Sequence, residues 1–191
     1  MQLTFIPTKL AGGVVIKGDN PTIRKIERLL ARTAIESYAC DDNGMCMTLS
    51  RYFEKKNDTV DWITLITGIA ALRHSIGYRL SRENHALMCI LEHSVFEALC
   101  KTLTEKAENV EAVLDSLYGF NDQLHGKYVE SRMTYLYLLK EPETRKEELL
   151  KILQSMSPTL KHMVRDYSEQ FKGLNSDMLT YAAGQKFEYE L

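Results

Sequence analysis

Residues 60–80 read VDWITLITGIAALRHSIGYRL, and this stretch decides the fold that we expect. Apolar side chains lie on nearly every side of a helix built from it, and such a helix is normally central in its fold. Polar residues interrupt the apolar run, which is also too short to cross a bilayer. We therefore predict a buried helix that is capped by Asp58 or Thr59 and ends near Leu80.

The chain before this helix begins with a predicted β-hairpin. Residues 3–6 and 14–17 are short runs of β-branched and aromatic side chains. Pro7 and the pair Gly12-Gly13 separate the two runs, which indicates antiparallel strands joined by a longer loop. We expect this hairpin to form a small sheet beside the helices.

A helix is predicted directly after the hairpin. Asp19 or Asn20 can cap it, with a proline at the first helical position. Apolar residues then recur at helical spacing up to about Tyr38. After a turn at residues 41–44 (DDNG), we expect residues 45–53 to form a third strand beside the hairpin.

The rest of the chain is typical of helices followed by one strand. Ser81 marks the start of the helix after the central one. The last residues, 186–191 (KFEYEL), alternate polar and apolar side chains, which is a strand pattern. We expect this tail to return and pair with the hairpin. The predicted helices cover about residues 81–108, 110–140, 143–156, 158–172 and 177–183.

The predicted fold is α+β and mainly α, with a bundle of five or six helices beside a small antiparallel sheet. The sheet comes from the N-terminal hairpin and, we expect, from the C-terminal tail. A chain of 191 residues fits one domain. Within it we distinguish the hairpin, first helix and turn region (1–58), the helical bundle (59–185) and the returning strand (186–191).

Composition and charge exclude several classes of protein. Hydrophobic residues make up 45% of the chain and charged residues 26%, which excludes disordered and collagen-like proteins. The net charge is −2, and the sequence lacks the sustained basic face that nucleic-acid binding requires. The start has no basic segment followed by a long apolar one, and none of the four cysteines has CxxC spacing. We therefore expect a cytoplasmic protein with reduced cysteines.

One charged residue lies on the predicted buried face of the central helix. Arg73 follows three large apolar residues at alternating steps of four and three. A guanidinium group stays charged, so a buried one needs a carboxylate or several carbonyl groups as partners. If the next helix packs antiparallel to this one, Glu92 lies within a turn of Arg73. We expect Glu92 to be its partner, with Glu97 as second choice.

Two histidines are predicted near the same level. His74 adjoins Arg73, and His93 lies in an otherwise mostly apolar stripe of the next helix. Two interpretations stay open. In the first, Arg73 and Glu92 form an internal ion pair, and the histidines fill polar contacts around it. The second is a pocket that binds an anionic ligand, lined by Arg73, His74, Glu92 and His93.

Three residues of the predicted helix 81–108 could reach a metal ion at successive turns. His85, Cys89 and His93 stand four residues apart. No carboxylate from another helix can be identified to complete such a site, so we expect no metal and no other cofactor. The cysteines are interpreted as small packing residues. Patterns such as GxSxG, HExxH and GxxxxGK do not occur in the sequence, so no catalytic residue is predicted.

The sequence FIPTKLAGG at residues 5–13, followed by IKGD at residues 16–19 and then by a helix, resembles a family of uncharacterised bacterial proteins of about this length. In that family a short hairpin precedes helices, and an Arg-His pair lies on a following helix, as Arg73-His74 does here. The resemblance covers the first half of the chain. It implies the fold and draws attention to Arg73 and His74, and it implies no activity.

These patterns favour a non-enzymatic binding or regulatory protein. We expect a homo-oligomer formed through amphipathic helices, so the predicted partner is a second copy or another protein, and neither nucleic acid nor a membrane. The alternative hypothesis is a small-molecule enzyme or sensor that binds an anion near Arg73, His74 and His93.

Overall fold

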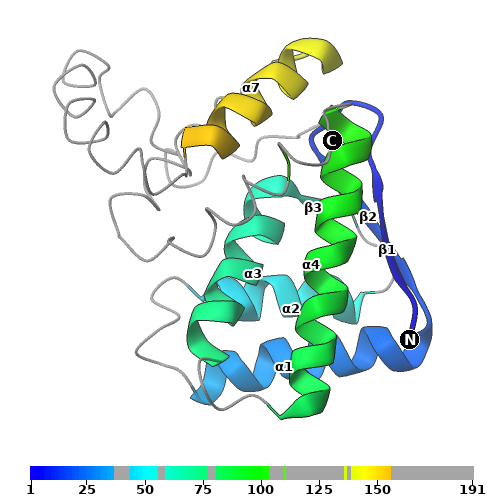
Figure 1. Cartoon of the computed structure of the whole chain (residues 1–191), viewed down its shortest axis with the longest axis vertical. Helices are drawn as coiled ribbons and strands as arrows, with labels where there is room; N and C mark the ends of the chain where they lie inside the picture. Colours follow the sequence, from blue (N-terminus) through cyan, green and yellow to red (C-terminus); the bar gives the residue numbers. More distant parts are fainter. Residues whose placement is uncertain are drawn as a thin grey trace, which may run out of the picture.

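The computed structural model describes residues 1–36, 44–55, 59–76, 81–103 and 139–155, together with Val110 and Leu136. It is mainly helical with a small antiparallel sheet, so the predicted α+β class is confirmed (Figure 1). The helices predicted around 110–140 and after residue 157, and the tail strand at 186–191, lie outside the described residues. The elements are β1 (Leu3–Pro7), β2 (Gly13–Gly18), α1 (Asn20–Glu36), α2 (Met45–Glu54), β3 (Thr59–Asp61), α3 (Trp62–Ile76), α4 (Arg82–Leu103) and α7 (Pro142–Ser155).

The sheet has the strand order β1-β2-β3, and both pairs are antiparallel. The predicted hairpin is therefore confirmed, with Phe5 opposite Ile16 in its register. Both of these side chains are buried, whereas Ile6 on the opposite face of β1 is 46% exposed. This alternation gives the sheet one face toward the core and one partly open face.

Helix α4 packs against β1 and covers part of its outer edge (Figure 1). The backbone N–H of Asp19 donates to the Gln2 carbonyl, so the carbonyl of the next residue, Leu3, points away from β2. The Ser94 hydroxyl of α4 lies 3.2 Å from that Leu3 oxygen and can donate to it. A helix thus satisfies a polar group that an uncovered edge strand would offer to another chain.

Helix α1 begins at the cap predicted for it. The Asp19 carboxylate accepts hydrogen bonds from the backbone N–H of Thr22 at 2.8 Å and from its hydroxyl at 2.9 Å. It also accepts a hydrogen bond from the backbone N–H of Gln2. The bonds from the Thr22 and Gln2 backbone lower the pKa of Asp19, because they stabilise the ionised carboxylate. One side chain therefore joins the start of α1 to the start of β1.

Replacing Asp19 with alanine should destabilise the protein at neutral pH, and the loss should shrink in acid. Because the pKa of Asp19 is lower in the folded state, its stabilising effect is present above the unfolded value of about 3.9. The effect disappears as the pH falls through the folded pKa. Thermal unfolding of wild type, Asp19→Ala and Asp19→Asn across this range checks the expectation. The asparagine variant keeps a capping side chain without the titration, so a pH dependence equal to that of wild type would contradict it.

Residues 45–53 form a helix, so the prediction of a strand there is wrong. The buried residues of α2 are Cys46, Leu49, Ser50 and Phe53, which recur at steps of three and four. This spacing buries one helical stripe, and α2 uses it to pack between α1 and α3. The third strand is instead the short β3, which pairs with β2 through Val60 opposite Val14.

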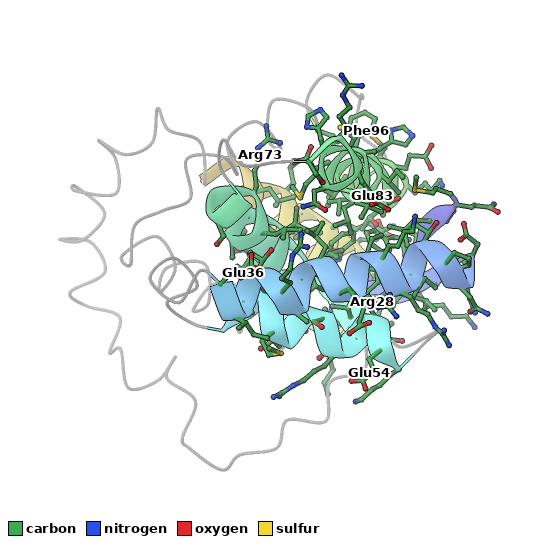
Figure 2. The ribbon with its side chains drawn as sticks, turned by 90° about the horizontal axis from the view of Figure 1, so that it is seen from below. Arg28, Glu36, Glu54, Arg73, Glu83 and Phe96 are labelled. Atoms are coloured by element: carbon green, nitrogen blue, oxygen red, sulfur yellow. The ribbon has the colours of Figure 1, made fainter. Side chains whose placement is uncertain are left out.

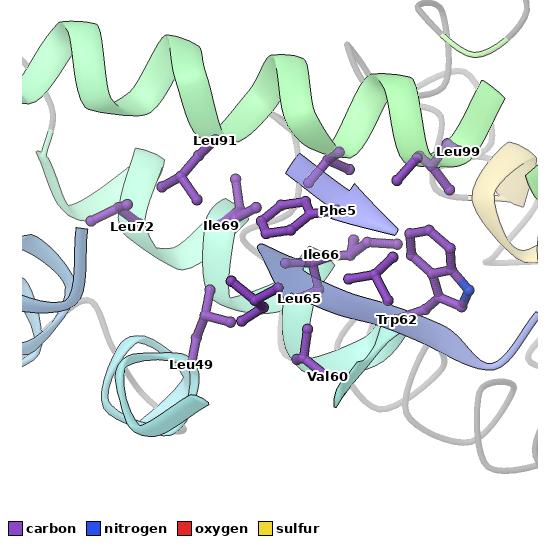
Figure 3. Packing of buried hydrophobic residues seen from close by; sticks show 14 of the residues in the cluster. Phe5, Leu49, Val60, Trp62, Leu65, Ile66, Ile69, Leu72, Leu91 and Leu99 are labelled. Carbon is purple, nitrogen blue, oxygen red and sulfur yellow. The ribbon is translucent and has the colours of Figure 1, made fainter. Parts of the chain in front are cut away.

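Helix α3 is central, as predicted, but it begins later than expected. Residues 59–61 belong to β3, so the cap is Asp61, whose carboxylate accepts bonds from the Thr64 backbone and hydroxyl, each at 2.8 Å. Nearly all of its described side chains are buried against the sheet, α2 and α4 (Figure 3). Helix α4 starts where Ser81 accepts a bond from the Asn84 N–H at 3.2 Å, which confirms the predicted start.

The loop between β1 and β2 is held by side chains from two distant helices. The indole N–H of Trp62, which is fully buried, donates to the Ala11 carbonyl at 3.0 Å. Arg145 of α7 is only 3% exposed and donates to the Leu10 carbonyl at 3.1 Å and to the Leu139 carbonyl. Within the loop, the Thr8 hydroxyl accepts bonds from the backbone N–H groups of residues 12 and 13. These contacts fix a glycine-rich loop that has no regular structure of its own.

Candidate functional site on α3 and α4

Arg73 and Glu92 form an ion pair between α3 and α4, so the predicted partner is confirmed. The pair lies beside a buried contact region to which Leu72 and Leu91 contribute (Figure 3). The side chain of Arg73 is 43% exposed and that of Glu92 is 24% exposed. An exposed pair of this kind contributes about 0–1 kcal/mol, because water screens it.

The predicted burial of Arg73 is therefore wrong. The sequence argument treated one stripe of α3 as buried along its whole length, but the stripe meets solvent at Arg73 near the end of the helix. Figure 2 shows Arg73 at the margin between α3 and α4. The buried guanidinium of the described structure is that of Arg145, which uses backbone carbonyls as partners. A buried arginine does need acceptors, as expected, but the buried arginine is Arg145 of α7 and not Arg73 of α3.

Of the four residues predicted to bind an anion, Arg73 and Glu92 are the two that the described contacts bring together. His93 is 69% exposed, and its Nε2 lies 3.5 Å from a carboxylate oxygen of Glu97. Its ring stacks on Phe96, with centroids 6.4 Å apart. The side chain of His74 is outside the described part of the structure. An anion at Arg73 would have to compete with Glu92, and anion binding here stays a prediction.

A second arrangement, which the sequence analysis described only as three spaced ligands, lies along the outside of α4. The residues at steps of four from His85 are all exposed, and contacts join His85 to Cys89 and Glu97 to both His93 and Lys101. The Nε2 of His85 lies 3.7 Å from the Sγ of Cys89, and the Nζ of Lys101 lies 3.4 Å from Glu97. We call these residues the outer row: His85, Cys89, His93, Glu97 and Lys101.

Partly exposed apolar and aromatic side chains border the outer row. Ile90, Phe96 and Cys100 pack against the core with one side and meet solvent with the other. Figure 2, which looks along α4, places Phe96 on the side of the helix away from α1. Burial raises the pKa of the Cys100 thiol, and the nearby Glu97 carboxylate raises this pKa further by a smaller amount. This thiol therefore stays protonated at neutral pH.

The cysteines do not share one environment. Cys46 is fully buried, and its Sγ lies 3.8 Å from the Gly68 carbonyl oxygen, as expected for a packing residue. Cys89 is exposed, so the interpretation of it as a packing residue is wrong. Among the residues described, no group of three or more His, Cys, Asp and Glu side chains is placed to hold a metal ion. Within this part of the chain, His85 and Cys89 thus form a pair of potential ligands without a third.

Comparison with known proteins assigns the chain to no family. None of the helices that the structure describes is long and apolar enough to cross a membrane. The resemblance to a bacterial family with an Arg-His pair stays a prediction. No protein-family model, curated protein or solved structure matches the chain.

Proposed function

We propose that the chain is a non-enzymatic interaction protein that binds a second copy of itself through the outer row of α4 and the apolar residues beside it. The observation that carries this proposal is the composition of an exposed helix face. From His85 to Phe96 the fully exposed residues are two histidines and one cysteine, and partly exposed apolar side chains lie beside them. The one charged residue of this range, Glu92, is paired with Arg73, whereas solvent-facing helices normally carry several charges. Depletion of charge together with exposed aromatic groups is typical of the centre of a protein interface.

A second copy is the partner that this surface fits best. In a twofold contact the same patch meets itself, so like charges on the patch would face each other. The middle of the row has no formally charged residue when the histidines are neutral, and Glu97 and Lys101 at its end compensate each other. A self-contact here therefore involves little electrostatic repulsion, which favours association of identical chains.

The proposal predicts a dimer that one charge substitution dissociates. In buffer containing EDTA, light scattering after size exclusion should give the dimer mass at high protein concentration. His93→Glu should raise the dissociation constant at least about tenfold, because each copy then has to bury a new carboxylate in the contact. Arg28→Gln on α1 changes the net charge equally and should leave the dimer intact. A strict monomer from low micromolar to near-millimolar concentration, or equal weakening by both variants, would overturn the proposal.

A further inference from the structure

We infer that His85 and Cys89 form half of a zinc site, which a second copy of the chain completes with the same two residues. The two residues stand one helical turn apart on α4, and both are exposed. Their Nε2 and Sγ atoms lie 3.7 Å apart, with the imidazole and the thiol already side by side. The inference rests on the proposed contact through the outer row and adds a ligand to it.

The separation of the two atoms suits a tetrahedral metal ion. Zinc binds thiolate sulfur at about 2.3 Å and imidazole nitrogen at about 2.0–2.1 Å, so a tetrahedral angle places the two ligand atoms about 3.6 Å apart. The observed 3.7 Å needs almost no rearrangement of either side chain. An ion that prefers nitrogen and sulfur ligands therefore fits between His85 and Cys89.

The described residues of one chain supply too few ligands, and a twofold contact supplies the rest. Structural zinc sites have four protein ligands, and the pair on α4 provides two. The next member of the outer row, His93, lies beside Glu97 and Phe96. Two antiparallel copies of α4 that meet at His85 and Cys89 bring together two imidazoles and two thiols. The sequence analysis argued against a metal site because it found no ligand on another helix. In this arrangement the second chain provides the remaining ligands.

Zinc binding at this site should release protons, and this release can be measured. Each Cys89 binds as a thiolate, so two thiol protons leave to solvent for each zinc ion bound, and neutral His85 binds through Nε2. No oxidant or reductant takes part. Binding should therefore weaken as the pH falls, because protons compete with the metal for both kinds of ligand.

The test adds zinc ions to the full chain under reducing conditions. We expect one zinc per two chains, a dimer at least about tenfold tighter than in EDTA, and, with Co²⁺ as probe, a thiolate-to-cobalt absorption band. Cys89→Ser and His85→Ala should lose the band and the zinc response, and both replace exposed side chains, so circular dichroism should confirm their fold. Arg28→Gln, at an exposed residue of α1 outside the outer row, is the control and should keep both.

The outcomes separate this inference from the proposed function. A dimer in EDTA that zinc leaves unchanged overturns the zinc site and leaves the self-contact standing. A monomer in EDTA that zinc converts to a dimer at one ion per two chains supports the site and overturns the metal-free contact. One zinc per chain without dimerisation, equal binding by Cys89→Ser, or a dimer that resists chelator but dissociates on reduction each overturns the inference.

Discussion

Replacing Trp62 with alanine is expected to lower the free energy of unfolding by about 3–5 kcal/mol. The side chain is fully buried where α3 meets the sheet and α4, with Leu99 nearby (Figure 3). Its removal leaves a large cavity, and it also leaves the Ala11 carbonyl without its indole donor. A buried acceptor that loses its partner costs about 1–3 kcal/mol, so the effect should fall at the upper end of the range.

Two further variants separate the contributions of the ring and the hydrogen bond. Trp62→Phe keeps an aromatic side chain but removes the N–H, and we expect a loss of about 1–3 kcal/mol. Ile6→Ala, at a residue that is 46% exposed, should change stability much less. Urea unfolding followed by far-ultraviolet circular dichroism measures all three, since Trp62 is the sole tryptophan and fluorescence disappears with it. A loss under 1 kcal/mol in Trp62→Ala would show that the ring is not part of the core.

Gly13→Ala should also destabilise the fold strongly, by about 1–3 kcal/mol or more, because β2 and β3 approach each other too closely for a side chain there. A Cβ atom at this position would lie 2.2 Å from the Val60 carbonyl oxygen and 2.9 Å from the Asp61 Cα. Both are backbone atoms, so relief requires the two strands to move apart. Movement there disturbs the start of α3, which follows β3 directly.

Gly44 offers a control, because glycine is favoured there by the backbone conformation and not by a shortage of space. It has a φ of 63°, and no atom lies within 4 Å of the Cβ that alanine would add. Gly44→Ala should therefore cost only the backbone penalty of about 1–2 kcal/mol, and Gly44→Asn should recover part of it, because asparagine tolerates this conformation. Gly13→Asn should recover nothing. Unfolding of the four variants distinguishes the two causes, and recovery by Gly13→Asn would argue against the steric one.

The hairpin and α1 could be predicted because their determinants are local. A cap at Asp19, a proline in the first turn and strand-like runs on either side of a loop act within a few residues. Residues 45–53 were mispredicted although a helical pattern was present. Cys46, Leu49 and Phe53 recur at helical spacing, but their types and those of Tyr52 and Thr48 also suit strands. In so short a segment the packing against α1 and α3 decides.

The two arginines show why burial was harder to predict. In α3 apolar residues lie on nearly every side of the helix, so a stripe through Arg73 looks no different from the truly buried ones. In α7 the segment PETRKEELLKILQS is dominated by charges, yet Arg145 lies on the stripe of Leu149, Ile152 and Leu153, all of which are buried. That spacing could have identified it. Its acceptor, the Leu10 carbonyl, is far away in the sequence and could not have been found from the pattern.

The candidate site, too, could be predicted from the sequence only in part. The pairing of Arg73 with Glu92 followed from the antiparallel arrangement of two consecutive helices, which limits the partners to about one turn. Three residues of the outer row were visible at steps of four, but their exposure was not, because the sequence analysis interpreted Cys89 as a packing residue and placed His93 in a mostly apolar stripe. A helix with apolar residues on several faces does not reveal which face turns outward.

The hydrogen bond from Arg145 to the Leu10 carbonyl also has a consequence for synthesis of the chain. It joins residues 135 positions apart, so the hairpin emerges long before the helix that holds its loop exists. At about 5–20 residues per second, the interval is on the order of ten seconds. Trp62 reaches the same loop only 51 positions after Ala11. Early in translation the nascent hairpin can therefore be secured by α3 alone, and α7 adds its contact last.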